Sequence, residues 1–219
     1  MRSIGLLLLL AACQSGSPAA PDAPIVPDSG TPAKLGIYVA WSAKPSLPGA
    51  LDDKLSVADA TFQLSQLELI GDAEPGSEST THSKYLLAWD ALGTPKPEEF
   101  PEAPVGMYSK ITVSMASVGL GALAYQIHGI WRDGGVAYPF RIEDRLPLRT
   151  TLDCQQMLAA GSWASIAISV ELEDPISHVD FKRLPVDAGG MVLATGDLQL
   201  LDFRDRLTKA FKVNDGDDE

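Results

Sequence analysis

The stretch that decides the fold is LAYQIHGIWRDGGVAYPFRI, residues 123–142. Apolar side chains stand at every second position on both sides of Asp133-Gly134-Gly135, which is the pattern of half-buried strands. Because Asp-Gly and Gly-Gly tolerate the positive φ angles of a tight turn, these residues predict an antiparallel hairpin. Pro139 has no amide donor, so we expect it at a sheet edge or a bulge.

The same two-residue period recurs in residues 35–41 and 164–172. Residues 85–89 form a short apolar run, and residues 107–115 are predicted to form another strand. Between the pairs Phe62/Leu64 and Leu67/Leu69 the period slips by one residue, which indicates a bulge or a corner. Several short strands with turn residues between them are typical of sandwiches and barrels. We therefore predict an all-β fold, an antiparallel β-sandwich of the transthyretin or immunoglobulin type.

Three segments are predicted to be helical, and they would decorate the sandwich. Asp153–Ala160 has an acidic N-cap and a glycine, Gly161, just past its end. Asp174-Pro175 places proline at the first position of a short helical turn. Leu200–Lys212 has an apolar face and favourable i,i+4 charge pairs, so we expect two or three short helices, one of them C-terminal.

A wider resemblance rests on three segments in order: ATFQLSQLELIG (60–71), LLAWD (86–90) and PVGMYSKI (104–111). This order resembles that of bacterial lipoprotein domains of unknown function with a transthyretin-like β-sandwich, in which a strand, a "dL" strand and a Pro-x-Gly-x-Tyr turn recur. Copper-associated periplasmic partner proteins of the methanobactin type share a similar layout. The resemblance covers residues 34–140 and implies the fold. No residues here match the copper family's metal site, so that activity is not carried over.

The N-terminus indicates secretion and a lipid anchor. A cation at Arg2 precedes an uncharged run from Ile4 to Ala12, which is far shorter than the roughly 20 residues needed to span a bilayer. Leu10-Ala11-Ala12-Cys13 resembles the lipobox of bacterial lipoproteins. That resemblance implies cleavage before Cys13 and a diacylglycerol on its sulfur. Gln14 stands where an aspartate would retain a lipoprotein at the inner membrane, so we expect the outer membrane, at its periplasmic face or the cell surface.

The chain is therefore predicted to have four parts. Residues 1–12 are a signal peptide, residues 13–33 are the lipidated cysteine and a Pro-rich tether, residues 34–212 are the sandwich, and residues 213–219 are an acidic tail. At ~3.1 Å per residue the tether reaches at most about 60 Å, and as a coil it averages nearer 25 Å.

The net charge restricts the partners. It is −12 for the full sequence, and cleavage would remove one cation, Arg2, to leave −13. Because nucleic-acid binding depends on lysine and arginine neutralising phosphates, we expect no nucleic-acid partner. Anionic headgroups would also repel the domain, so the lipid has to hold it at the membrane.

The second cysteine is Cys154, and lipidation of Cys13 argues against an intrachain disulfide. We interpret Cys154 as a small buried apolar residue, with a disulfide-linked dimer as the alternative. His82, His128 and His178 lack metal-ligand spacing, so no metal site is predicted, although distant segments could still assemble one.

Catalytic and cofactor motifs are also lacking: the sequence holds no G-x-S-x-G elbow, no P-loop and no dinucleotide fingerprint. Trp41, Trp89, Trp131 and Trp163 could include a sugar-stacking platform, but Trp41 and Trp131 alternate in phase with apolar neighbours, which favours the core. We expect a non-enzymatic, cofactor-free module that binds or scaffolds an envelope protein or a glycan. A metal carrier of the copper type and an envelope polysaccharide hydrolase are the alternatives.

Overall fold

The computed structural model describes residues 35–71, 79–82, 84–90 and 93–214. The chain divides into two units, Met1–Pro32 and Ala33–Glu219, and the described residues all belong to the second. The predicted signal peptide, Cys13, the tether and residues 215–219 of the tail lie outside the described residues.

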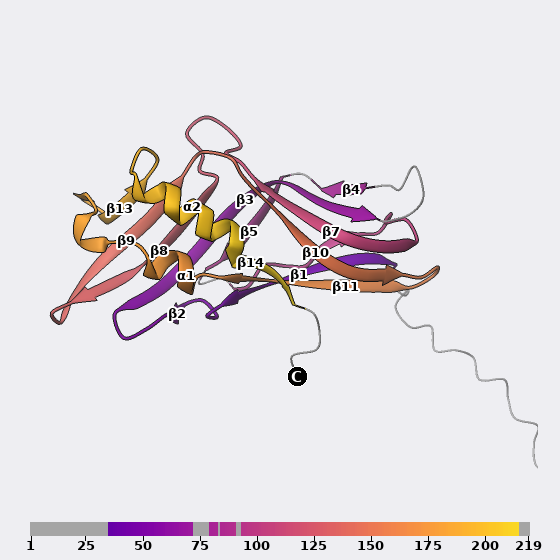
Figure 1. The fold of residues 1–219 in the computed structure, drawn as a ribbon, viewed down its shortest axis with the longest axis horizontal. Coiled ribbons are helices and arrows are strands. Elements are labelled where there is room, and N and C mark those ends of the chain that lie inside the picture. Colours follow the sequence, from indigo (N-terminus) through magenta and orange to yellow (C-terminus); the bar gives the residue numbers. More distant parts are fainter. Residues whose placement is uncertain (1–34, 72–78, 83, 91–92, 215–219) are drawn as a thin grey trace, which may run out of the picture. The chain divides into compact units, whose positions relative to one another are not determined.

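The described residues of the second unit are mostly in strands, with two short α-helices and one 3-10 turn among them (Figure 1). The strands are β1 (Gly36–Lys44), β2 (Gly49–Ala50), β3 (Leu55–Gly71), β4 (Ser79–His82), β5 (Tyr85–Trp89), β6 (Glu98–Phe100), β7 (Gly106–Met115), β8 (Tyr125–Asp133), β9 (Val136–Asp144), β10 (Leu148–Leu158), β11 (Trp163–Glu171), β12 (Val186–Asp187), β13 (Gly190–Ala194) and β14 (Phe211–Asn214). The helical elements are α1 (Glu173–Ser177), η1 (Phe181–Arg183) and α2 (Gln199–Ala210). The predicted all-β sandwich is confirmed.

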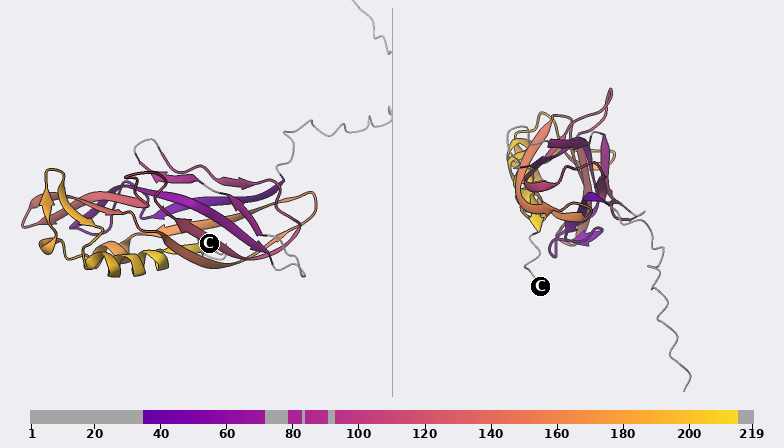
Figure 2. Two further views of the ribbon diagram at one scale, coloured as in Figure 1. Left: turned by 90° about the horizontal axis from the view of Figure 1, so that it is seen from above. Right: turned by 90° about the vertical axis from the view of Figure 1, so that its right-hand side faces the viewer.

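Two sheets form the layers, and both are mixed. The smaller has the order β14-β11-β1-β6, and the larger runs β10-β7-β3-β8-β9-β13-β12, with β2, β4 and β5 also paired to β3. Most neighbours are antiparallel as expected, but β1 pairs with β11 and β9 pairs with β13 in parallel. Figure 2 (right) looks along the strands and shows the sheets curving around a common interior with α2 on the outside.

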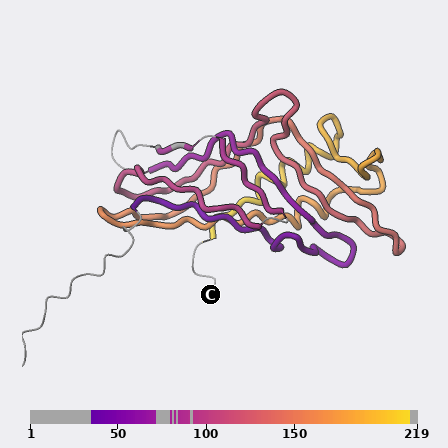
Figure 3. Tube along the Cα trace, turned by 180° about the vertical axis from the view of Figure 1, so that it is seen from behind, coloured from indigo at the N-terminus to yellow at the C-terminus, as the bar shows by residue number. Residues whose placement is uncertain are grey.

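Strand β3 is the longest element and organises the larger sheet; its course can be followed from behind in Figure 3. Its first part pairs with β8 and its second part with β7, so β7 and β8 lie end to end along one side of it. The Gln63 amide donates to the Ala124 carbonyl and its carbonyl accepts from Ala116, which closes the loop between these two strands. The ladder shifts register between Leu64 and Gln66, where the sequence predicted a bulge or corner.

The predicted hairpin is confirmed as β8 and β9, with Gly134 and Gly135 at φ 58° and 85°. Pro139 lies one residue before the part of β9 that pairs with β13, so its missing amide costs no bond in that ladder. Opposite Phe140 stands Gly129, where a Cβ would lie 2.4 Å from the phenyl ring. The Phe140 ring therefore occupies the space above this glycine.

One helix prediction was wrong. Asp153–Ala160 is not helical, because residues up to Leu158 belong to β10 and pair with β7. The register shifts between Asp153 and Gln156, and Cys154 and Leu158 are buried on the inner face. Burying two apolar side chains within an existing ladder outweighs the local capping preference. Gly161, at φ 72°, belongs to the link between β10 and β11 instead of a helix C-terminus.

The other two helix predictions are confirmed in position, but α1 begins at Glu173, so Pro175 is its third residue and not its first. Helix α1 contains Asp174-Pro175, and α2 buries the face formed by Leu200, Phe203 and Leu207. The predicted range Leu200–Lys212 is two residues too long, because Phe211 and Lys212 already belong to β14. That strand extends the smaller sheet to Asn214, two residues into the predicted tail.

A buried ion pair attaches α2 to the larger sheet. Asp144, at the end of β9, has no exposed surface and pairs with Arg204 of α2. Its carboxylate also accepts bonds from the Leu146 amide (3.0 Å) and the Thr195 hydroxyl (3.1 Å). Burial and the charge of Asp144 raise the pKa of the neighbouring Tyr125 hydroxyl. The helix is therefore held to the β9–β10 corner by charge as well as by apolar packing.

None of the helices in the described ranges has the length and apolar character required of a membrane span.

Candidate functional site

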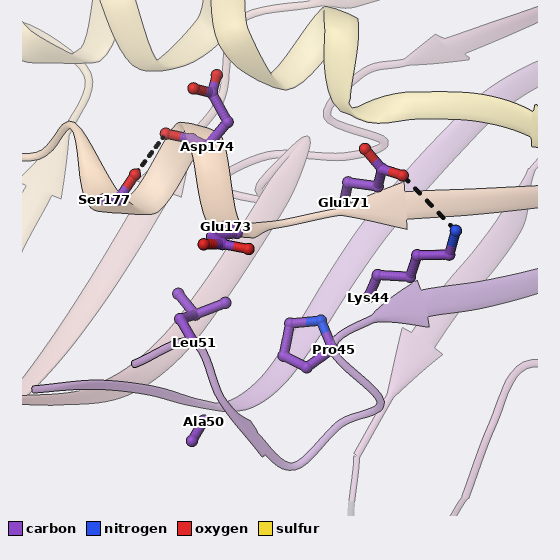
Figure 4. A pocket seen from close by; sticks show the side chains of 8 residues that line it. All are labelled: Lys44, Pro45, Ala50, Leu51, Glu171, Glu173, Asp174 and Ser177. Carbon is purple, nitrogen blue, oxygen red and sulfur yellow. Dashed lines mark hydrogen bonds and ion pairs between the residues drawn. The ribbon is translucent and has the colours of Figure 1, made fainter. Parts of the chain in front are cut away.

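The candidate site is a groove of about 560 Å³ beside the end of the smaller sheet (Figure 4). Its lining comes from the ends of two parallel strands, the segment that follows β1, and helix α1. The lining residues are Lys44, Pro45, Ala50, Leu51, Glu171, Glu173, Asp174 and Ser177.

The sheet register positions one side of the groove. Because β1 and β11 are parallel, both end at the same edge, and Lys44 is the Cα partner of Glu171. The Lys44 ammonium lies 3.7 Å from a Glu171 carboxylate oxygen. The Leu172 amide then donates to the Lys44 carbonyl at 2.9 Å, which leads the chain directly into α1.

Two of the carboxylates that line the groove form ion pairs with cations outside it. Glu171 also pairs with Lys212 of β14, and Asp174 lies 3.2 Å from the Arg206 guanidinium of α2. Within the part of the chain that the structure describes, no ion pair reaches Glu173. This exposed carboxylate faces an apolar wall formed by Pro45, Ala50 and Leu51. The groove can accept a cationic group carried on a short apolar chain.

Ser177, His178 and Asp174 lie together at α1, but not as a nucleophile relay. The Ser177 hydroxyl and an Asp174 carboxylate oxygen both approach Nδ1 of His178, each at 3.4 Å. A serine nucleophile and its orienting carboxylate need the two different nitrogens of the imidazole. The Ser177 hydroxyl instead donates to the Asp174 carbonyl at 3.2 Å, as Figure 4 shows.

The structure does not bring the three histidines together. His82 of β4 lies 2.9 Å from Glu98, and His128 of β8 lies 2.7 Å from Asp59. Burial raises the pKa of Glu98, and the nearby His82 opposes that rise. Among the described residues, no group of three or more histidine, cysteine, aspartate or glutamate side chains is placed to hold a metal ion.

Cys154 is buried, as the sequence indicated, and its thiol donates to the Tyr108 carbonyl at 3.6 Å.

The tryptophans are scattered. Trp41 and Trp89 are buried. Trp131 is half-buried and stacks on Phe181, with the two ring centroids 5.8 Å apart. Trp163 is 60% exposed on the outer face of β11. The four rings therefore do not form one sugar-stacking platform.

Sequence reasoning missed the groove because its members come from separate segments. Lys44 and Glu171 are brought together only by the parallel pairing of β1 with β11, which joins strands far apart in the chain. The one local signal was Asp174-Pro175, which located α1 correctly. Comparisons with known proteins add no further signal, since no family model, no curated protein and no solved structure matches the chain.

Proposed function

We propose that the protein is a lipid-anchored lipoprotein of the bacterial cell envelope, with the lipid on Cys13 and a non-enzymatic binding or scaffolding module at the end of a tether. The observation that carries this proposal is the sequence Leu10-Ala11-Ala12-Cys13, placed directly after a charged start and a short apolar run. Gln14 supports an address at the outer membrane.

The physics of anchoring supports the same proposal. A single acyl chain binds a membrane only marginally, so stable anchoring needs two or more chains, which a processed lipobox cysteine provides. The predicted tether that follows Cys13, residues 14–33, contains five prolines and would act as a spacer. The acidic composition would resist adsorption to anionic headgroups, which leaves the anchor to hold the protein.

The groove favours a protein partner over a glycan. Its carboxylates and its apolar wall complement a lysine or arginine side chain of an envelope protein, because each can bury a methylene stem while its cation meets Glu173. Nucleic acid remains an unsuitable partner for so acidic a chain.

The anchor is tested by labelling cells with radioactive or clickable palmitate and separating the membrane fraction. Cys13→Ser is expected to abolish labelling and release the protein from the membranes, because the variant has no thiol to carry the diacylglycerol. Cys154→Ser is the matched control and should keep both properties, because its thiol is buried in the sandwich. Labelling that survives Cys13→Ser would contradict the lipoprotein proposal.

A further inference from the structure

On one side of the sandwich, the edges of the two sheets meet without a backbone ladder. The larger sheet ends there in β4 and β5, which pair with β3 along the side that β7 and β8 leave free. The smaller sheet ends in β6, which among the described strands pairs with β1 and with neither β4 nor β5. We call the boundary between β6 and these two strands the seam.

Side chains connect the two sheets across the seam. Nδ1 of His82, on β4, lies 2.9 Å from a carboxylate oxygen of Glu98, on β6. The His82 ring also meets the Phe100 ring edge-on, with the centroids 4.6 Å apart. The Tyr85 hydroxyl of β5 donates to the carbonyl of Lys96, two residues before β6. These contacts depend on side chains alone, and one of them depends on charge.

The His82–Glu98 pair occupies positions that face the interior. Cross-strand partners lie on the same face of a sheet. His82 is the partner of Leu67 and Glu98 is the partner of Val39, and both apolar residues are fully buried. The Glu98 side chain is 16% exposed, and its burial raises its pKa, while His82 opposes that rise and Glu99 adds to it. Ionised Glu98 is therefore costly here, and a protonated His82 offsets part of the cost.

The other groups around the pair do not supply a second cation. Burial and the charge of Glu98 raise the pKa of the Tyr85 hydroxyl, so this side chain is uncharged near neutral pH. Lys84 and Lys96 are exposed, and in the described ranges no ion pair joins either of them to Glu98. Strand β3 contributes the apolar Leu67. In the part of the chain that the structure describes, His82 is therefore the group that offsets the Glu98 charge.

We propose that the seam is a pH-sensitive switch, which is closed while His82 is protonated and opens as the pH rises and His82 becomes neutral. Histidine side chains change charge near about pH 6.5. Above that range, ionised Glu98 stays partly buried without an opposing charge, which favours a state in which water reaches it. Because the described strands have no ladder across the seam, it can open while the pairing within each sheet is kept.

The titration of Glu98 acts in the same direction. Since burial raises its pKa, the closed seam favours its protonated form, and this contribution is lost as the pH rises. Both groups therefore favour the closed seam on the acidic side. The inference concerns the sandwich alone and does not rest on the proposed anchor.

A second histidine–carboxylate pair provides the matched control. Nδ1 of His128 lies 2.7 Å from Asp59, and both side chains are about as exposed as His82. These two residues are Cα partners in the ladder of β3 with β8. Backbone hydrogen bonds therefore hold their strands together whatever the charge of His128.

Spin labels on the two sheets measure the opening of the seam. Leu86→Cys on β5 and Ser42→Cys on β1 place labels at exposed positions of the full chain. Cys13→Ser and Cys154→Ser leave only the two introduced thiols to react. Double electron–electron resonance at about pH 5.5 and about pH 8.5 then gives the distance distributions on either side of the histidine titration. We expect a longer distance whose population rises about three- to tenfold at the higher pH.

Two variants of the pair are expected to act in opposite directions. Glu98→Gln removes the buried charge and should keep the seam closed at both pH values. His82→Gln removes the cation and should populate the longer distance at both. His128→Gln should keep the pH response of the natural pair. If the pair only contributes packing, both of its variants should populate the longer distance and the pH response should be absent.

The result that overturns the proposal needs no change to the pair itself. Equal distance distributions at the two pH values, with His82 and Glu98 both present, would show that the seam does not respond to pH. A pH response that persists in His82→Gln, or that disappears in His128→Gln, would also overturn the proposal, because another group would then be responsible.

Discussion

Replacing Arg204 with alanine is expected to lower the free energy of unfolding by about 3 kcal/mol. The Arg204 side chain is 17% exposed and pairs with Asp144, which has no exposed surface. Removing one partner of a buried pair costs about 3–5 kcal/mol, because the remaining charge stays out of water. The lower figure applies here, since Asp144 keeps its bonds from the Leu146 amide and the Thr195 hydroxyl. Arg204 also donates to the Pro147 carbonyl at 2.6 Å, so the β9–β10 corner loses a second attachment.

The assay is equilibrium denaturation followed by circular dichroism and by fluorescence of the buried tryptophans. For a domain of this size the loss corresponds to a melting temperature lower by about 6–12 °C. Lys209→Ala, on the same helix, is the control; its pair with Asp205 is exposed and should contribute below about 1 kcal/mol. Equal losses in the two variants would refute the idea that a buried ion pair holds α2 in place.

Two further predictions concern the larger sheet. Gly129→Ala should destabilise the domain by about 1–3 kcal/mol, because its methyl group would overlap the Ser56 carbonyl oxygen and the Phe140 ring. An unchanged melting temperature would contradict this overlap. The hydrogen bond from Arg141 lowers the pKa of Asp187 to about 2. Ionised Asp187 therefore stabilises the β12–β13 turn fully above its unfolded pKa of 3.8, and this contribution disappears as the pH falls through about 2. Carboxyl NMR titration should find the Asp187 pKa raised in Arg141→Met but still below 3.8, because the Gly189 amide continues to donate to the carboxylate. An unchanged low value there would contradict Arg141 as the main cause.

Much of the fold could be predicted from local pattern. The alternation in residues 164–172 and the turn at Gly134-Gly135 reappear as β11 and the β8–β9 hairpin, because burial on one face fixes a two-residue period wherever the strand pairs. The apolar face of α2 was equally visible, since it depends only on residues within one segment.

What failed depended on partners distant in sequence. Asp153 and Gly161 satisfied the local rules for a helix, yet the ladder with β7 determined the outcome. The parallel pairs of β1 with β11 and of β9 with β13 have no local signature, because period two does not identify a strand's neighbour.

The candidate sites also differ in whether their residues are neighbours in the sequence or are brought together by the fold. The proposed lipobox, Leu10-Ala11-Ala12-Cys13, is contiguous in the chain, so its proposal needs only the local sequence. The residues of the groove are not contiguous in the chain: Lys44 meets Glu171 only after the smaller sheet has formed. Exposure also could not be assigned by residue type, since Trp89 is buried and Trp163 is not.

The most direct test of the account is the mass of the N-terminal peptide of the protein purified from bacterial membranes in detergent. Cleavage before Cys13 with diacylglycerol on its sulfur predicts a chain that begins at this residue and carries the added mass of at least two acyl chains, removable by alkaline hydrolysis of their esters. A chain that begins elsewhere, or an unmodified Cys13 in membrane-derived protein, would contradict the central claim.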